Sequence, residues 1–298
     1  MKAMTRVLTL AGVLAIACFP APASSFQSED EAARLARSVL EKQKERPFWF
    51  HMRSILFGYV PYVFDVKATV FKYDSKGNVE PGCKTLPHGT GVFVPIEESL
   101  HYIPLEFCGN PVAMKTRKTW EQTREDKIAE SKRKSDADKA KSRAAAAKQR
   151  LERAQFWDEF IKAFRFQIVE RRIHNERPTT RLSFTPMPGY RPGSAIDTKY
   201  LPKLRGQFWV DDADNEIGHI EFEFIENVTA GFGLIGKVSA GSSYSMDLSK
   251  QIEGQWLPAR AETVLKMRAL LVMKTNQRYI YEWGNYRKFS TDVRVLEP

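Results

Sequence analysis

Short segments that alternate apolar and polar residues fill most of the chain outside residues 113–165, and turn-forming residues separate them. Successive side chains of a β-strand point to opposite faces, so a period of two predicts half-buried strands. Short turns between strands favour antiparallel pairing. The pattern predicts an α+β fold: a curved antiparallel sheet, or half-open barrel, of roughly eight to eleven strands that is covered by helices.

The strands are expected on both sides of residues 113–165. Before this helical segment, residues 62–73 form a predicted strand that places Tyr62, Phe64, Val66, Ala68 and Val70 on one face. The other predicted strands span 90–94, 101–107, 164–173, 179–186, 206–211, 218–226, 242–248, 253–274 and 278–289. A helix is expected before the first strand, because Ser28 and Glu31 form a capping box and Pro47 ends the run.

Residues 115–164 contain no Gly or Pro and are rich in Ala, Lys, Arg and Glu, which predicts helix. Phe156, Phe160 and Phe164 recur at four-residue steps, so the end of this run should dock on the sheet. The middle has almost no apolar side chain larger than Ala, which predicts a long solvated helix or helical hairpin that projects from the body.

These boundaries give one barrel domain with an insertion. Residues 24–112 hold the first helix and strands, residues 113–165 form the basic helical insertion, and residues 166–298 complete the same barrel. From residue 115 to 153 there are 14 Lys or Arg against 7 Asp or Glu, most of the chain's net charge of +10. Solvation of an exposed helix explains this excess. The alternative is attraction of Lys132, Arg133 and Lys134 to an anionic membrane surface.

The first 23 residues have the features of a signal peptide. Lys2 and Arg6 precede an apolar stretch too short to span a bilayer, and residues 21–23 form a small-x-small cleavage site. The mature chain is then expected in the periplasm or elsewhere in the envelope, where nucleic acid is not a ligand. Residues 15–18 also resemble a lipobox, and acylated Cys18 would anchor the chain to a membrane instead.

Two cysteines follow the signal segment, Cys83 and Cys108. An oxidising compartment favours a disulfide between them, and two buried thiols are the alternative. The five histidines are scattered and match no metal-ligand spacing, so no metal is expected.

Two segments imitate ligand-binding motifs. Gly231, Gly236 and Lys237 have nearly P-loop spacing, but Val238 replaces the hydroxyl residue and no helix-forming run follows. Residues 212–223 approximate a calcium loop, but Ile217 stands where the bend needs Gly. Neither a nucleotide nor another cofactor is expected.

Catalytic patterns are also weak. The chain has no Gly-x-Ser-x-Gly elbow. Glu221 and Glu223 share one strand face, a spacing compatible with acid–base catalysis, but a solvated face explains the same alternation. The chain is therefore expected not to be an enzyme.

Four segments resemble exported bacterial proteins of the outer-membrane lipoprotein-sorting type, the LolA/LolB-like group: "RLSFTPMPGYRPG", "LPKLRGQFWVDDADNEIGHIEFEF", "GQWLPARAETVLKMRALLVMK" and "YEWGNYRKFSTDVRV". The resemblance covers roughly the last 120 residues and consists of strand patterns. It implies a half-open barrel whose apolar cavity, between sheet and helices, takes acyl chains. The present chain is longer than the smaller members and adds the basic helical run.

One strand face is the expected ligand surface. Its candidate residues are Phe184, Phe208, Val210, Phe222, Phe224 and Trp256. The expected function is non-enzymatic binding of a lipid or lipoprotein acyl chain, unless these side chains simply fill the core. The alternatives are an envelope scaffold that binds a partner through its basic helix and, less favoured, an exported hydrolase.

Overall fold

The computed structural model describes residues 24–45, 62–74, 76–80, 83, 88–96, 99–174, 176–193, 196–230, 236–269 and 273–288. The predicted signal segment, Cys18, Pro47 and the glycines at 231 and 233 lie outside these residues. Within the described ranges, no helix is both long and apolar enough to cross a bilayer.

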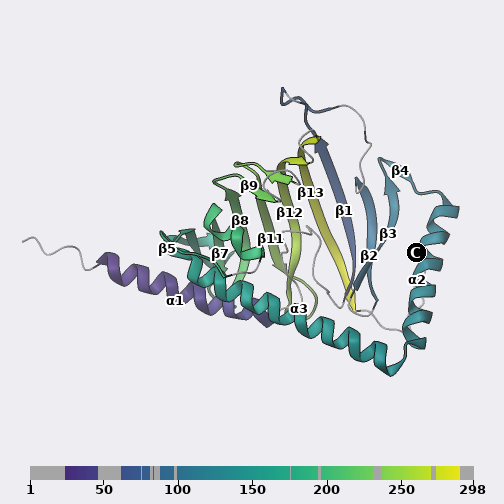
Figure 1. Ribbon diagram of the computed structural model, residues 1–298, viewed down its shortest axis with the longest axis horizontal. Coiled ribbons are helices and arrows are strands. Elements are labelled where there is room, and N and C mark those ends of the chain that lie inside the picture. The colour runs from purple at the N-terminus through teal and green to yellow at the C-terminus, as the bar shows by residue number, and fades with distance from the viewer. Residues whose placement is uncertain are drawn as a thin grey trace, which may run out of the picture.

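One large antiparallel sheet dominates the fold (Figure 1). Its strands are β1 (Tyr62–Lys72), β2 (Gly89–Ile96), β3 (Ser99–Phe107), β4 (Asn110–Pro111), β5 (Phe164–His174), β6 (Arg177–Pro186), β7 (Leu204–Asp211), β8 (Glu216–Phe224), β9 (Val228–Ala230), β10 (Gly236–Val238), β11 (Ser243–Lys250), β12 (Trp256–Ala269) and β13 (Met273–Lys288). The order is β4-β3-β2-β1-β13-β12-β11-β8-β7-β6-β5, with β10 pairing β12 and β9. Among the described strands, the two end strands, β4 and β5, do not pair, so the sheet is open.

The structure confirms the predicted curved antiparallel sheet. It has 13 strands rather than eight to eleven, because the very short strands β4, β9 and β10 carry too little alternation to be recognised. The last long strand, β13, pairs with the first, β1, so the segments before and after the helical run form one sheet.

The register divides the sheet into two faces. On the inner face, Phe208 of β7 lies opposite Ile220 of β8, which lies opposite Met246 of β11. On the outer face, Glu221 of β8 and Glu262 of β12 both lie opposite Ser245 of β11. The core is therefore on the inner face, and polar side chains cover much of the outer one.

Helices α1 (Ser24–Glu45) and α3 (Asp136–Ala163) pack together at the β5 end of the sheet. Ala32, Ala36, Val39 and Leu40 of α1 are completely buried. α1 begins four residues before the predicted capping box, so Ser28 lies inside the helix. Arg171 of β5 donates to Glu31 of α1 at 2.6 Å, which ties the helix to the edge strand.

The basic run forms two helices, α2 (Met114–Arg133) and α3, that meet at a bend rather than one helix or a hairpin (Figure 1). Ser135 makes the break because its Oγ accepts a hydrogen bond from the Asp138 amide at 3.2 Å and caps α3. α2 packs beside β2 and β3 and brings Lys127 Nζ to 3.5 Å from His101 Nδ1.

The predicted disulfide is confirmed. Cys83 and Cys108 are bonded, with Cα atoms 5.5 Å apart. Cys108 and Gly109 both have positive φ, 54° and 78°, in the tight turn between β3 and β4. The bridge attaches this turn to the segment that follows β1.

Candidate functional site

Five of the six predicted ligand residues lie together on the inner face. Phe184, Phe208, Val210, Phe222 and Phe224 are all buried, with exposed fractions of 0% to 9%. The ring of Phe184 meets Phe160 of α3 with centroids 5.2 Å apart, and Phe208 lies 6.2 Å from Phe166 of β5. Phe184 and Phe208 therefore belong to the packing of α3 on the sheet.

Trp256 packs against the same core but differs from the other five in its polar contacts. This half-buried side chain lies at the start of β12, and its Nε1 donates to Asp214 at 3.0 Å. The guanidinium of Arg177 lies 5.8 Å from the indole centroid. Lys250 also binds Asp214, at 3.0 Å, so the segment that resembles a calcium loop uses this carboxylate in a charged network at the end of the sheet.

A row of aromatic rings crosses four strands at the other end of the inner face. We call it the aromatic wall: Tyr102 of β3, Phe93 of β2, Phe64 of β1 and Tyr286 of β13. Each neighbouring pair of rings has centroids 5.2 Å apart. Phe64 is buried, and the other three rings are half-buried.

A second aromatic row runs along β13. The rings of Tyr279 and Tyr281 are stacked at 6.4 Å, and those of Tyr281 and Trp283 at 5.6 Å. Burial, and then the neighbouring Tyr279, raises the pKa of Tyr281 to about 12. Burial also raises the pKa of Tyr102 and of Tyr279. These phenols stay neutral at physiological pH, so the surface they form is uncharged.

The aromatic wall lies away from the closest helix packing. α1 and α3 pack most closely around β5, at the opposite end of the sheet. His101, the residue near α2, alternates with Tyr102 along β3 and so points to the outer face. Val94 and Ile103 share that face and are buried. α2, the described helix beside β2 and β3, therefore lies toward the outer face and not over the aromatic wall.

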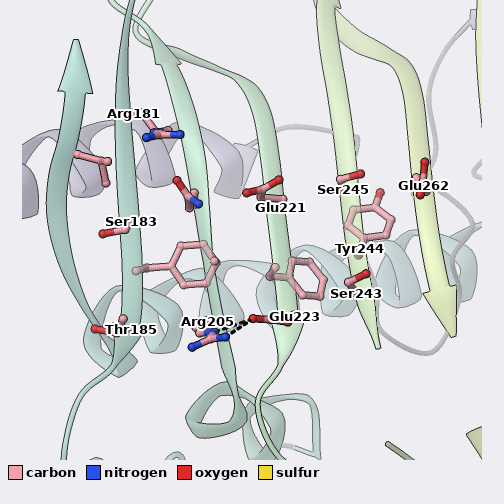
Figure 2. A pocket seen from close by; sticks show the side chains of 15 residues that line it. Arg181, Ser183, Thr185, Arg205, Glu221, Glu223, Ser243, Tyr244, Ser245 and Glu262 are labelled. Atoms are coloured by element: carbon pink, nitrogen blue, oxygen red, sulfur yellow. Dashed lines mark hydrogen bonds and ion pairs between the residues drawn. The ribbon is translucent and has the colours of Figure 1, made fainter. Parts of the chain in front are cut away.

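The outer face carries a polar trough of about 570 Å³. Figure 2 shows its labelled side chains on neighbouring strands from β6 to β12, with helices behind the sheet. Its lining includes Ser183, Gln207, Glu221, Ser243, Ser245 and Glu262. Glu221 and Glu223, predicted to lie on a solvated face, are both part of the trough.

Charges in and near the trough are compensated by neighbours. Arg205 donates to Glu223 at 2.6 Å (Figure 2). Arg278 makes two hydrogen bonds to Glu262, at 2.8 and 2.9 Å, and these bonds hold the pKa of that carboxyl below its usual range.

Next to the trough, His219 Nδ1 lies 2.5 Å from Asp247, and His219 Nε2 lies 3.6 Å from Glu221. The hydrogen bond with His219 lowers the pKa of Asp247.

The described end of the P-loop-like segment does not form a phosphate-binding helix. Residues 236–238 form β10, a strand between β9 and β12, so Lys237 does not start a phosphate-binding helix. Within the described part of the chain, no three His, Cys, Asp or Glu side chains are grouped to hold a metal ion.

The sequence contained a signal for the aromatic rows that its interpretation did not use. Tyr279, Tyr281 and Trp283 alternate in a strand that was predicted, and Phe64 was assigned to one face of another. These residues lie on one surface because β1 pairs with β13, a contact between segments far apart in the sequence.

No protein-family model matches this sequence, and no curated protein matches it. Three solved structures are similar to the chain. A DUF1329 family protein from Desulfovibrio piger is 10% identical, with 90% of this chain and 95% of that chain covered and a TM-score of 0.29. A LolA superfamily protein from Nitrosomonas europaea is 10% identical, with 87% and 94% covered and a TM-score of 0.28.

The third is a domain from Vibrio parahaemolyticus named for outer membrane lipoprotein sorting. It is 9% identical, with 90% of this chain and 95% of that chain covered and a TM-score of 0.32. The names of the last two agree with the resemblance seen in the sequence motifs. At these TM-scores the likeness assigns neither a ligand nor an activity.

Proposed function

We propose that this chain is a non-enzymatic protein of the bacterial envelope that binds a hydrophobic ligand, a lipid or lipoprotein acyl chain, against the inner face of its open sheet. The observation that carries the proposal is the aromatic wall. Its four rings form a contiguous apolar surface across four strands, and three of them are only half-buried. The export signal predicted at residues 1–23 supports the envelope location.

The ligand region differs from the set predicted from the sequence. Phe184 and Phe208 pack against the aromatic side chains that bury α3 and β5. Phe222 is also buried, but it stacks on Tyr244 at 5.3 Å, toward the middle of the sheet. We therefore place the acyl chain along the aromatic wall and the β13 row, where aromatic rings supply apolar contact without charge.

A titration of the mature chain with a fluorescent fatty-acid probe tests the proposal. We expect binding in the micromolar range. Phe93→Ala and Tyr102→Ala should each weaken it, because each removes a ring from the half-buried part of the wall. Ile173→Ala is the matched control: its side chain is 66% exposed on β5, far along the sheet order from the wall.

Two outcomes would contradict the proposal. One is a mature, folded chain that binds no probe. The other is a pair of wall variants that melt like the parent chain and bind the probe as tightly as Ile173→Ala does.

A second candidate function is that of a scaffold that binds an anionic surface through the α2–α3 bend. Lys132 and Arg133 are exposed there, whereas Lys134 is half-buried. Ala144, Ala145 and Ala147 of α3 are exposed as well, so this part of the helix contributes little to the core. The two functions use different residues and can be tested separately.

A further inference from the structure

We propose that the polar trough on the outer face is a second binding site, and that it takes a neutral oligosaccharide. The trough lies on the face opposite the aromatic wall, so this inference goes beyond the proposed function. Its volume of about 570 Å³ is within the range of small-molecule sites and suits a ligand of a few sugar rings.

The first argument is the arrangement of hydrogen-bonding groups. A sugar hydroxyl both donates and accepts, so a site that recognises several hydroxyls must offer both kinds of group at short intervals. Ser245 stands between Glu221 and Glu262 on adjoining strands. The two glutamates are two strand spacings apart, about 10 Å. Ser183, labelled in Figure 2, lies on β6 directly opposite Gln207 of β7, and the two continue the row.

The second argument is charge. The guanidinium of Arg205 is paired with Glu223, and Glu262 is held by Arg278. The remaining glutamate of the floor, Glu221, lies 3.6 Å from His219 Nε2. Because the protein already supplies counter-charges to Arg205, Glu223 and Glu262, a strongly charged ligand would gain little from these groups. An uncharged ligand rich in hydroxyls can use the same oxygens and hydroxyls without breaking an ion pair.

The third argument is the shape of the backbone at Gly206. A Cβ atom at this position would lie 2.1 Å from the Glu221 carbonyl oxygen and 2.5 Å from Phe184 Cζ, so no other residue fits. The glycine lets β7 and β8 approach closely under the trough, and Val169, which is 46% exposed on β5, supplies apolar surface in its lining. Apolar surface beside polar groups is what the C–H faces of a sugar ring require.

Saturation-transfer NMR with the mature chain tests the site, using cellotetraose, maltotetraose and the tetramer of N-acetylglucosamine as probes and a hyaluronate oligomer as the charged comparison. We expect saturation transfer to at least one neutral probe. Glu221→Gln should weaken its binding about tenfold, as should Ser245→Ala. Glu282→Gln is the matched control, because this exposed glutamate lies on β13 outside the trough and should leave the affinity unchanged.

The proposal fails if none of the neutral probes receives saturation, if Glu221→Gln and Ser245→Ala bind like Glu282→Gln, or if the hyaluronate oligomer binds more tightly than every neutral probe. Competition with the fatty-acid probe separates the two sites. A neutral oligosaccharide that leaves the fatty-acid affinity unchanged supports a separate site, and one that displaces the fatty acid overturns it.

Discussion

Phe184 of β6 meets Phe160 of α3 with ring centroids 5.2 Å apart and ring planes at 66°. This edge-to-face contact fixes the last turns of the basic helix on the sheet. Both side chains are buried, with exposed fractions of 1% and 5%.

Truncation of either ring should destabilise the protein. We expect Phe184→Ala to lower the free energy of unfolding by about 3–5 kcal/mol, because it leaves a cavity among aromatic side chains. A double-mutant cycle with Phe160→Ala should give a coupling of about 0.5–1.5 kcal/mol in urea unfolding. Additive effects of the two substitutions would show that the rings do not interact.

The ion pair between Asp211 and Arg177 should make stability depend on acid. Hydrogen bonding from Arg177 lowers the pKa of Asp211, which is 3% exposed. A lowered pKa stabilises the fold above the unfolded-state value, about 3.9, and that stabilisation is lost as the pH falls through the folded-state value. We expect Asp211→Asn to be less stable at neutral pH and to lose less stability on acidification. Asp65→Asn, at an exposed pair with Arg287, is the control.

The disulfide should contribute measurably to stability. It closes a loop with a sequence separation of 25 residues. In the chain-entropy model such a loop is worth about 3 kcal/mol. We expect the double variant Cys83→Ser, Cys108→Ser to unfold at a lower urea concentration, because its free energy of unfolding should fall by about 3 kcal/mol. Intact-mass measurement without reductant should show the parent chain lighter than its reduced form by two hydrogens, and a chain with two free thiols would contradict the bridge.

Charge reversal at the α2–α3 bend tests the scaffold function. If Lys132 and Arg133 contact an anionic membrane, Lys132→Glu with Arg133→Glu should reduce co-sedimentation with phosphatidylglycerol vesicles, since each basic side chain near such a surface is worth about 1 kcal/mol. Lys76→Glu, at an exposed turn after β1, is the control. The effect should shrink as salt is added. Equal sedimentation of both variants and the parent would show that the bend does not bind the vesicles.

Local pattern was sufficient for most of the fold. The alternation of Phe64, Val66 and Ala68 predicts β1, and the run of Ala, Lys and Glu predicts helix, because both signals lie within one element. The bend at Ser135 was not predicted, although Ser135 and Asp138 have the spacing of an N-cap. A single cap inside a run without Gly or Pro is a weak signal, since the same residues are also tolerated on a solvated helix.

The site was harder to predict because it depends on long-range packing. Alternation along β6 and β7 correctly places Phe184 and Phe208 on an inner face, but it cannot say which part of that face a helix covers. Trp256 shows the other difficulty. The irregularity between Asp247 and Leu248 shifts the β11–β12 register, so Trp256 ends opposite Lys250 at the end of the sheet.

Photocrosslinking gives the most direct test of the central claim, that a hydrophobic ligand lies along the inner face at the aromatic wall. The mature chain is irradiated with a diazirine-labelled fatty acid, digested, and mapped by mass spectrometry. We expect adducts concentrated on the peptides that contain Phe64, Phe93, Tyr102 and Tyr286, and loss of these adducts when unlabelled fatty acid is in excess. Adducts confined to α2 and α3, or labelling that excess fatty acid does not compete, would contradict the account.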